Sequence, residues 1–196
     1  MLSCNTVLTV LNLEGNSISG SGAVAIAEAL RHHVALRHLN LSGNVCGSEA
    51  GTAFAEMLRT NSSLTRLELA HCSFSNQGVA HFDGALRTNR TLEALDLSGN
   101  LITEPLALQL VSTLTELREE TPLTQLVMLH NDIDPPCQLT IQQLLGGEWK
   151  CKNSVAGIGL RKRHQPRTDE AVAALSKKQA LARPARPARH ATPRRR

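Results

Sequence analysis

The histidines and cysteines are the residues of this sequence that could ligate a metal ion or act as a nucleophile and its base. The eight histidines are scattered along the chain and include no HExxH pair, so their spacing predicts no metal site. The five cysteines stand at positions 4, 46, 72, 137 and 151, an odd number without CxxC spacing. We therefore expect neither a disulfide framework nor a zinc ion, and no other metal or cofactor.

Two glycine-rich stretches could bind phosphate, but neither has the required context. GNSISGSG at 15–22 lacks the Gly-Lys-Ser/Thr that completes a phosphate-binding loop, and GIG at 157–159 precedes no helical pattern. The GxSxG motif of serine hydrolases is also absent from the sequence. With no catalytic residue predicted, the sequence indicates a protein that is not an enzyme.

A repeated template must position whatever side chains carry the function. The pattern LxxLxLxxN recurs five times, with Cys72 in place of Asn in the third copy and Met128 in place of Leu in the fifth, at intervals of 28, 28, 28 and 31 residues. The copies begin at Leu8, Leu36, Leu64, Leu92 and Leu123, and a partial sixth copy begins at Val155. Five copies in step predict a solenoid in which each repeat covers the core of the next.

In this template and period the sequence resembles leucine-rich repeat proteins, and within them the ribonuclease-inhibitor-like subfamily with repeats of about 28 residues. The resemblance covers about residues 5–160. It implies an α/β leucine-rich repeat solenoid, a horseshoe of five to six parallel concave strands with convex helices. We assign residues 1–160 to this domain and residues 161–196 to a separate basic tail.

The last position of the template forms a column of polar residues. Its members are Asn16, Asn44, Cys72, Asn100 and Asn131. The resemblance implies that these side chains bond to backbone groups where each strand bends into a loop. Such groups cost roughly 1–3 kcal/mol each when they are buried without a partner. Because the pattern of the family that the sequence resembles permits cysteine in this column, we interpret Cys72 as structural and not as a reactive thiol.

A second apolar register lies between the strands, and its i, i+4 spacing predicts one buried face on each helix. The aligned positions are Ile26, Phe54, Phe82, Leu110 and Ile141. Ser48 and Asn76 are suited to cap helix N-termini, and Pro105 is suited to a first turn. Asn61 and Asn89 fall at helix exits, where asparagine tolerates a left-handed backbone. We interpret their glycosylation sequons as helix stops.

The side chains between the strand leucines are expected to project from the concave face, because side chains alternate along a strand. This surface is polar and mildly acidic, which predicts a docking site for a partner with a basic or hydroxyl-bearing surface. The candidate partner-binding residues are Asn12, Glu14, His38, Asn40, Arg66, Glu68, Asp96 and Gln125. Glu68 and Asp96 form the predicted centre. The alternative is a solvated face that binds nothing.

The basic tail contrasts with an acidic repeat domain. Residues 161–196 contain 12 Lys/Arg and 2 Asp/Glu, a net charge of +10, whereas residues 1–160 contain 9 Lys/Arg and 15 Asp/Glu, a net charge of −6. Proline at every third position in part of the tail favours an extended chain, so we expect it to be mostly disordered. Its functional alternatives are a nuclear localisation signal, a weak contact with nucleic acid or another acidic surface, and a strap onto the repeat domain.

Composition narrows the compartment and the partner. Aromatic residues make up 2% of the chain, which predicts an aliphatic core and disfavours a surface that stacks nucleic-acid bases. The N-terminal stretch MLSCNTVLTVLNL has no basic segment before its apolar run, and no stretch approaches the length of a membrane span. We expect a cytoplasmic protein, with the nucleus as the alternative if the tail is a signal.

These observations predict a non-enzymatic scaffold that binds another protein of unknown identity on the repeat surface. The repeats also resemble those of Ran GTPase-activating proteins, which implies GTPase regulation, although this array is shorter and its tail is basic where that family has an acidic region. A third resemblance is to the terminal sensor repeats of NOD-like receptors. It implies a fragment of a larger array, in which further repeats would cover the leucines of the first repeat.

Overall fold

The computed structural model describes residues 2–117 and 120–145. They all belong to the first of two compact units into which the chain divides, Met1–Gly157 and Ile158–Arg196. The partial sixth repeat predicted at 155–160 and the tail predicted at 161–196 lie outside the described residues.

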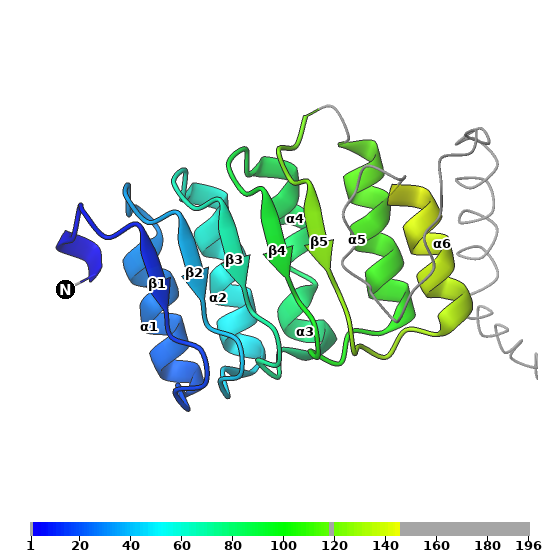
Figure 1. Ribbon diagram of the computed structural model, residues 1–196, viewed down its shortest axis with the longest axis horizontal. Helices are drawn as coiled ribbons and strands as arrows, with labels where there is room; N and C mark the ends of the chain where they lie inside the picture. The colour runs from blue at the N-terminus through cyan, green and yellow to red at the C-terminus, as the bar shows by residue number, and fades with distance from the viewer. Residues whose placement is uncertain (1, 118–119, 146–196) are drawn as a thin grey trace, which may run out of the picture. The chain divides into compact units, whose positions relative to one another are not determined.

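Strands and helices alternate along the described chain, and the strands form one parallel sheet (Figure 1). The sheet order is β1-β2-β3-β4-β5, so neighbours in the sheet are neighbours in sequence. The strands are β1 (Val10–Asn12), β2 (His38–Asn40), β3 (Arg66–Glu68), β4 (Ala94–Asp96) and β5 (Gln125–Val127). The helical elements are η1 (Leu2–Cys4), α1 (Gly20–Leu30), α2 (Gly47–Thr60), α3 (Ser75–Val79), α4 (Phe82–Thr88), α5 (Glu104–Glu116) and α6 (Pro135–Leu145). Figure 1 shows α1 to α6 on one side of the sheet, and we call the opposite side the concave face. The predicted α/β leucine-rich repeat solenoid is confirmed.

The central leucines of the strands form a continuous stack inside the repeats. Leu11, Leu39, Leu67, Leu95 and Leu126 lie opposite one another in consecutive strand pairs. Leu39 and Leu67 are fully buried and Leu95 and Leu126 are 1% exposed, whereas Leu11 in the first strand is partly exposed. Each fully buried leucine contributes roughly 1.5–3 kcal/mol to folding, so the stack is a main source of stability.

The helices close the other side of this core through the second apolar register. Phe54 of α2, Phe82 of α4 and Leu110 of α5 are fully buried. Ile26 of α1 is partly exposed, because no repeat precedes the first one in the described chain. The third repeat divides its helical segment into α3 and α4, where the other repeats have one helix.

The asparagine column ties each strand-to-helix loop to the loop of the repeat before it. Asn100 is fully buried and shows the pattern. Its Oδ1 accepts hydrogen bonds from the backbone N–H groups of Cys72 at 3.0 Å and Phe74 at 3.3 Å. Its Nδ2 donates to the carbonyl oxygens of Leu69 at 2.8 Å and Ser98 at 3.2 Å. One side chain therefore satisfies four backbone groups in two repeats.

The other members of the column differ in how much of this pattern they make. Asn44 and Asn131 each accept from two backbone N–H groups of the preceding repeat and donate to carbonyl oxygens in both repeats. Asn16 is exposed, and its Nδ2 donates to the carbonyl oxygen two residues before it. Cys72 is buried, and its thiol donates to the carbonyl oxygen of Leu41 at 3.3 Å. A thiol is a weak donor and acceptor, so this position is the weakest buried link of the column.

A second polar column, formed by His33, Asn61 and Asn89, lies where the helices end and the next strands begin. Asn61 Oδ1 accepts hydrogen bonds from the backbone N–H groups of Ser63 at 3.0 Å and Leu64 at 2.8 Å. Its Nδ2 donates to the carbonyl oxygens of Leu30 at 2.7 Å and His33 at 3.3 Å in the preceding repeat. This column therefore links the C-terminal ends of neighbouring helices, as the asparagine column links the loops that lead into the helices.

The left-handed backbone predicted at these exits is wrong. Asn61 and Asn89 are extended, with φ of −72° and −71°, because the side-chain bonds and not the backbone make the turn. Both side chains are buried and their amides are occupied, so neither asparagine presents an accessible glycosylation site. His33 stands in the same column, and its Nδ1 accepts from two backbone N–H groups at 3.2 and 3.0 Å. Its buried Nε2 has no hydrogen-bond partner within the described residues.

Two predicted N-caps are also wrong, because their side chains bond across to the next repeat. Ser48 lies within α2, and its hydroxyl donates to the carbonyl oxygen of Phe74. Asn76 lies within α3 and bonds twice to Thr103, accepting from its N–H at 3.0 Å and donating to its hydroxyl at 2.8 Å. Pro105 stands in the first turn of α5, as its fixed φ predicts.

Candidate functional site

The parallel register brings the predicted partner-binding residues side by side on the concave face. His38 lies opposite Arg66, and Glu68 lies opposite both Asn40 and Asp96. The other members lie toward the ends of the same face. Asn12 belongs to β1, Glu14 follows that strand, and Gln125 belongs to β5. Which of these residues contact a partner stays a prediction.

Glu68 is the centre of a small charged network on this face. Its Oε1 lies 3.2 Å from Nε2 of His38 and 3.6 Å from a guanidinium nitrogen of Arg66. The Glu68 side chain is 28% exposed, so the network is open to solvent. An ion pair this exposed contributes only about 0–1 kcal/mol to folding. The network therefore holds three polar side chains in place without being needed for the fold.

Three members of the predicted set also have a structural role. Asn12, Asn40 and Asp96 each accept a hydrogen bond from the backbone N–H two residues further on, at 2.9–3.0 Å. Such bonds fix the turn that follows each strand. Asn40 also donates to Glu14 at 3.0 Å. Among Asn12, Asn40, Glu68 and Asp96, Glu68 is the residue whose observed side-chain bonds go to other side chains and not to the backbone.

Two serines outside the predicted set connect neighbouring repeats. The hydroxyl of Ser42 accepts from the backbone N–H of Ala70, and that of Ser98 accepts from the N–H of Leu129, both at 3.1 Å. Their signal in the sequence is the string LSGN, which occurs at 41–44 and again at 97–100. These serines therefore hold the loops that follow the strands.

A shallow hollow lies beside Glu68 over β3, β4 and β5. Its side-chain rim is formed by Arg66, Glu68, Asp96, Gln125 and Val127. The accessible space is about 30 Å³, which holds one or two water molecules and no organic ligand. This face can therefore receive the side chain of a partner protein, but it does not enclose a small substrate.

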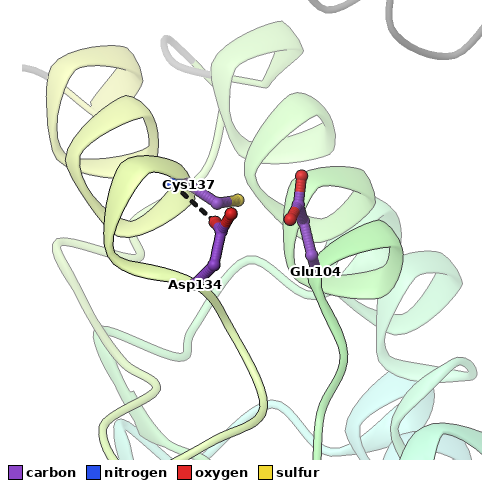
Figure 2. A group of neighbouring side chains, drawn as sticks. All are labelled: Glu104, Asp134 and Cys137. Atoms are coloured by element: carbon purple, nitrogen blue, oxygen red, sulfur yellow. Dashed lines mark hydrogen bonds between the residues drawn. The ribbon is translucent and has the colours of Figure 1, made fainter.

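Glu104, Asp134 and Cys137 are the group of described residues whose donor atoms come close enough to hold a metal ion, within 4.8 Å of one another (Figure 2). Asp134 precedes α6, and its carboxylate accepts a hydrogen bond from the backbone N–H of Cys137 at 2.8 Å. Glu104 is the first residue of α5. Carboxylates at helix N-termini are stabilised by the exposed N–H groups and the helix dipole, which oppose a cation at the same place. A capping bond for Asp134 and a first-turn position for Glu104 account for the two carboxylates of this group, which the sequence analysis did not predict.

The thiols of Cys46 and Cys72 are both buried. The neighbouring Cys46 thiol, together with burial, raises the pKa of Cys72 well above its ordinary value. The thiolate is the nucleophilic form of cysteine, so Cys72 is poorly suited to react. This agrees with the structural interpretation of Cys72.

Comparison with known proteins points to the same fold. A family model described as Leucine Rich repeat matches residues 4–27, 60–81 and 88–104. A solved structure described as actin-binding site 2 of leiomodin-1 is similar, with a TM-score of 0.60, 19% sequence identity and coverage of 89% of each chain. No curated protein matches the sequence.

The fold and these matches define a leucine-rich repeat solenoid, and domains with this fold generally serve as binding scaffolds. At 19% identity, the leiomodin structure is similar in fold alone. Among the helices that the structure describes, none is long and apolar enough to cross a membrane.

Proposed function

We propose that this chain is a non-enzymatic scaffold that binds another protein through the concave face, within the ribonuclease-inhibitor-like type of repeat. The observation that carries the proposal is the network of Glu68 with His38 and Arg66 beside the shallow hollow. These side chains project from a sheet whose backbone is fixed by two polar columns. A preorganised surface of this kind loses little entropy on binding.

The chemistry of the face favours a partner that presents basic or hydroxyl groups. Glu14, Glu68 and Asp96 supply three carboxylates, whereas Arg66 supplies one permanent positive charge. A basic side chain of the partner can approach Glu68 and Asp96 across the hollow between them. The cytoplasmic location, with the nucleus as the alternative, remains part of this proposal.

Charge reversal on two faces tests the proposal. Glu68→Lys with Asp96→Lys reverses the concave charge, and Glu56→Lys is the matched control on α2, where Glu56 pairs with Arg59 at 3.6 Å. Proteins cross-linked to the full-length chain in its native cells would be quantified for all variants, with circular dichroism to check folding. At least one partner should be lost from the concave variant and retained by the control. Identical partner sets for folded variants would reject the concave face as the binding surface.

Two narrower partners can be tested with purified proteins. Actin is suggested only by the description of the leiomodin structure, and a GTPase only by the resemblance to Ran GTPase-activating proteins. A binding titration with monomeric actin and a GTP-hydrolysis assay with Ran decide these alternatives separately from the general proposal.

A further inference from the structure

Two buried cysteines, Cys46 of the second repeat and Cys72 of the third, lie at the boundary between these repeats. Cys46 is 1% exposed, Cys72 is fully buried, and both are free thiols. The backbone N–H of Gly47 donates to the carbonyl oxygen of Cys72 at 3.0 Å, so the two loops touch directly beside both cysteines. Neighbouring strands of a parallel sheet lie about 4.8 Å apart, which falls within the range of about 4.4–6.8 Å for the Cα atoms of a disulfide.

The asparagine column fixes the direction of the Cys72 side chain. In other repeat pairs the Oδ1 atom of the column accepts a hydrogen bond from the backbone N–H of the residue equivalent to Cys46. These bonds join Asn44 to Ile18 at 2.8 Å, Asn100 to Phe74 at 3.3 Å and Asn131 to Ile102 at 3.0 Å. Cys72 stands in the same column, and its thiol donates to the carbonyl oxygen of Leu41 in the second repeat at 3.3 Å. The Cys72 sulfur therefore reaches across the boundary into the repeat that contains Cys46.

The two thiols differ in how readily they lose a proton. The neighbouring Cys72 thiol lowers the pKa of Cys46, whereas the neighbouring Cys46 thiol, together with burial, raises the pKa of Cys72. Such mutual influence requires groups that lie within a few ångströms of each other. The pair therefore combines a cysteine with thiolate character and a close neighbour that keeps its proton.

The loop that carries Cys46 lies at the surface, although the Cys46 side chain turns into the core. Val45 before it is 69% exposed, and the space beside the Cα atom of Gly47 after it is open. A brief local opening of this loop is enough to admit an oxidant as small as hydrogen peroxide. Cys72 does not have to meet the oxidant, which agrees with its burial.

We propose that Cys46 and Cys72 form a reversible disulfide bond within the folded repeat domain when the protein meets hydrogen peroxide. The Cys46 thiolate attacks one peroxide oxygen, which breaks the O–O bond, forms a sulfenic acid on Cys46 and releases hydroxide. The Cys72 sulfur then attacks the Cys46 sulfur, and the sulfenic hydroxyl leaves as water with the proton of Cys72. The hydroxide takes up the proton that Cys46 had released, so the thiols are oxidised by two electrons and the peroxide is reduced to water.

The bond would join the loops that follow β2 and β3, where the asparagine column has its weakest buried link. These two strands carry His38, Arg66 and Glu68, so oxidation would fix the spacing of the strands beneath the charged network. The disulfide does not depend on which surface binds a partner, and its test is independent of the proposed function.

Peptide mapping of the full-length chain after treatment with hydrogen peroxide tests the proposal. Trypsin separates the two cysteines, because it cleaves the sequence into peptide 38–59 with Cys46 and peptide 67–87 with Cys72. Cys46→Ala and Cys72→Asn each remove one partner, and asparagine is the usual residue of the column. Cys4→Ala is the matched control, since Cys4 is exposed and lies outside the pair. Circular dichroism of every variant and of the oxidised chain checks the fold.

The oxidised monomer on a non-reducing gel should yield peptides 38–59 and 67–87 joined, with a loss of about 2 Da for the two hydrogen atoms removed. Dithiothreitol should separate them again. The linked peptides should persist in the Cys4 variant and be absent from the other two variants. Free Cys46 and Cys72 thiols in a folded chain whose Cys4 is already oxidised would overturn the proposal. Links from these peptides to other cysteines, or a joined pair found only after native circular dichroism is lost, would also overturn it.

Discussion

Replacement of Asn100 by alanine should destabilise the repeat domain more than any replacement on its exposed surface. The asparagine is fully buried and satisfies four backbone groups, two N–H groups in the preceding repeat and two carbonyl oxygens. Each buried donor left without an acceptor costs roughly 1–3 kcal/mol. Counting the two N–H groups alone, we expect a loss of about 2–6 kcal/mol, a large fraction of the 5–15 kcal/mol that is typical of a domain.

Asn16→Ala is the matched control for this prediction. Asn16 occupies the same position in the first repeat, but it is exposed, and its observed side-chain bond is one donation to a carbonyl oxygen of its own loop. Its replacement should therefore cost less than about 1 kcal/mol, since water can take over that bond.

Urea unfolding of the wild-type chain and both variants, followed by circular dichroism, measures the two free energies. The slope with urea should stay constant if each variant unfolds from the same native state. If the losses for Asn100→Ala and Asn16→Ala agreed within about 0.5 kcal/mol, burial of the column could not be the source of its stabilising effect.

Three further predictions concern the core and the thiols. Leu67→Ala should lower the free energy of unfolding by about 2–5 kcal/mol and Leu11→Ala by clearly less, because Leu67 is fully buried and Leu11 is partly exposed. Urea unfolding measures both values, and equal losses would contradict the stacking of the repeats. In a Cys151→Ser background, a thiol reagent at neutral pH should modify the exposed Cys4 first and the buried Cys72 only as the chain unfolds. Rapid modification of Cys72 in the folded chain would refute its burial. The raised pKa of Cys72 should make stability fall as the pH rises above the ordinary thiol pKa of about 8.5, because the folded chain keeps a proton that the unfolded chain releases, whereas the lowered pKa of Cys46 acts in the opposite direction. Cys72→Ser should show a weaker decline in urea unfolding between pH 8 and 10, and parallel curves would show that Cys72 is not responsible.

The sequence by itself determined the solenoid, the positions of its strands and the apolar faces of its helices. The reason is that these features depend on one local pattern repeated in step. A leucine at the same place in every 28-residue repeat can be buried only by the leucine of the next repeat, so Leu39, Leu67 and Leu95 stack wherever the repeats do. The same pattern assigns alternate side chains of each strand to the concave face.

Only the tertiary structure decided which polar side chains meet. Ser48 and Asn76 have the composition of helix caps, yet they bond to Phe74 and Thr103 in the following repeats. Local sequence cannot distinguish a cap from a bond between repeats, because both satisfy the same hydrogen-bonding capacity. The choice depends on which backbone group the stacking brings within about 3 Å.

The stacking of the His71 and His130 rings, whose centroids lie 6.4 Å apart, depends on the structure in the same way. Each histidine belongs to a different repeat, and no spacing within either repeat indicates the other. Their rings come together because two strand ends share one backbone turn and because Gly99 between them has no side chain. Sequence period fixes which residues occupy equivalent places, whereas the distance between two side chains follows from the packing of everything that lies between them.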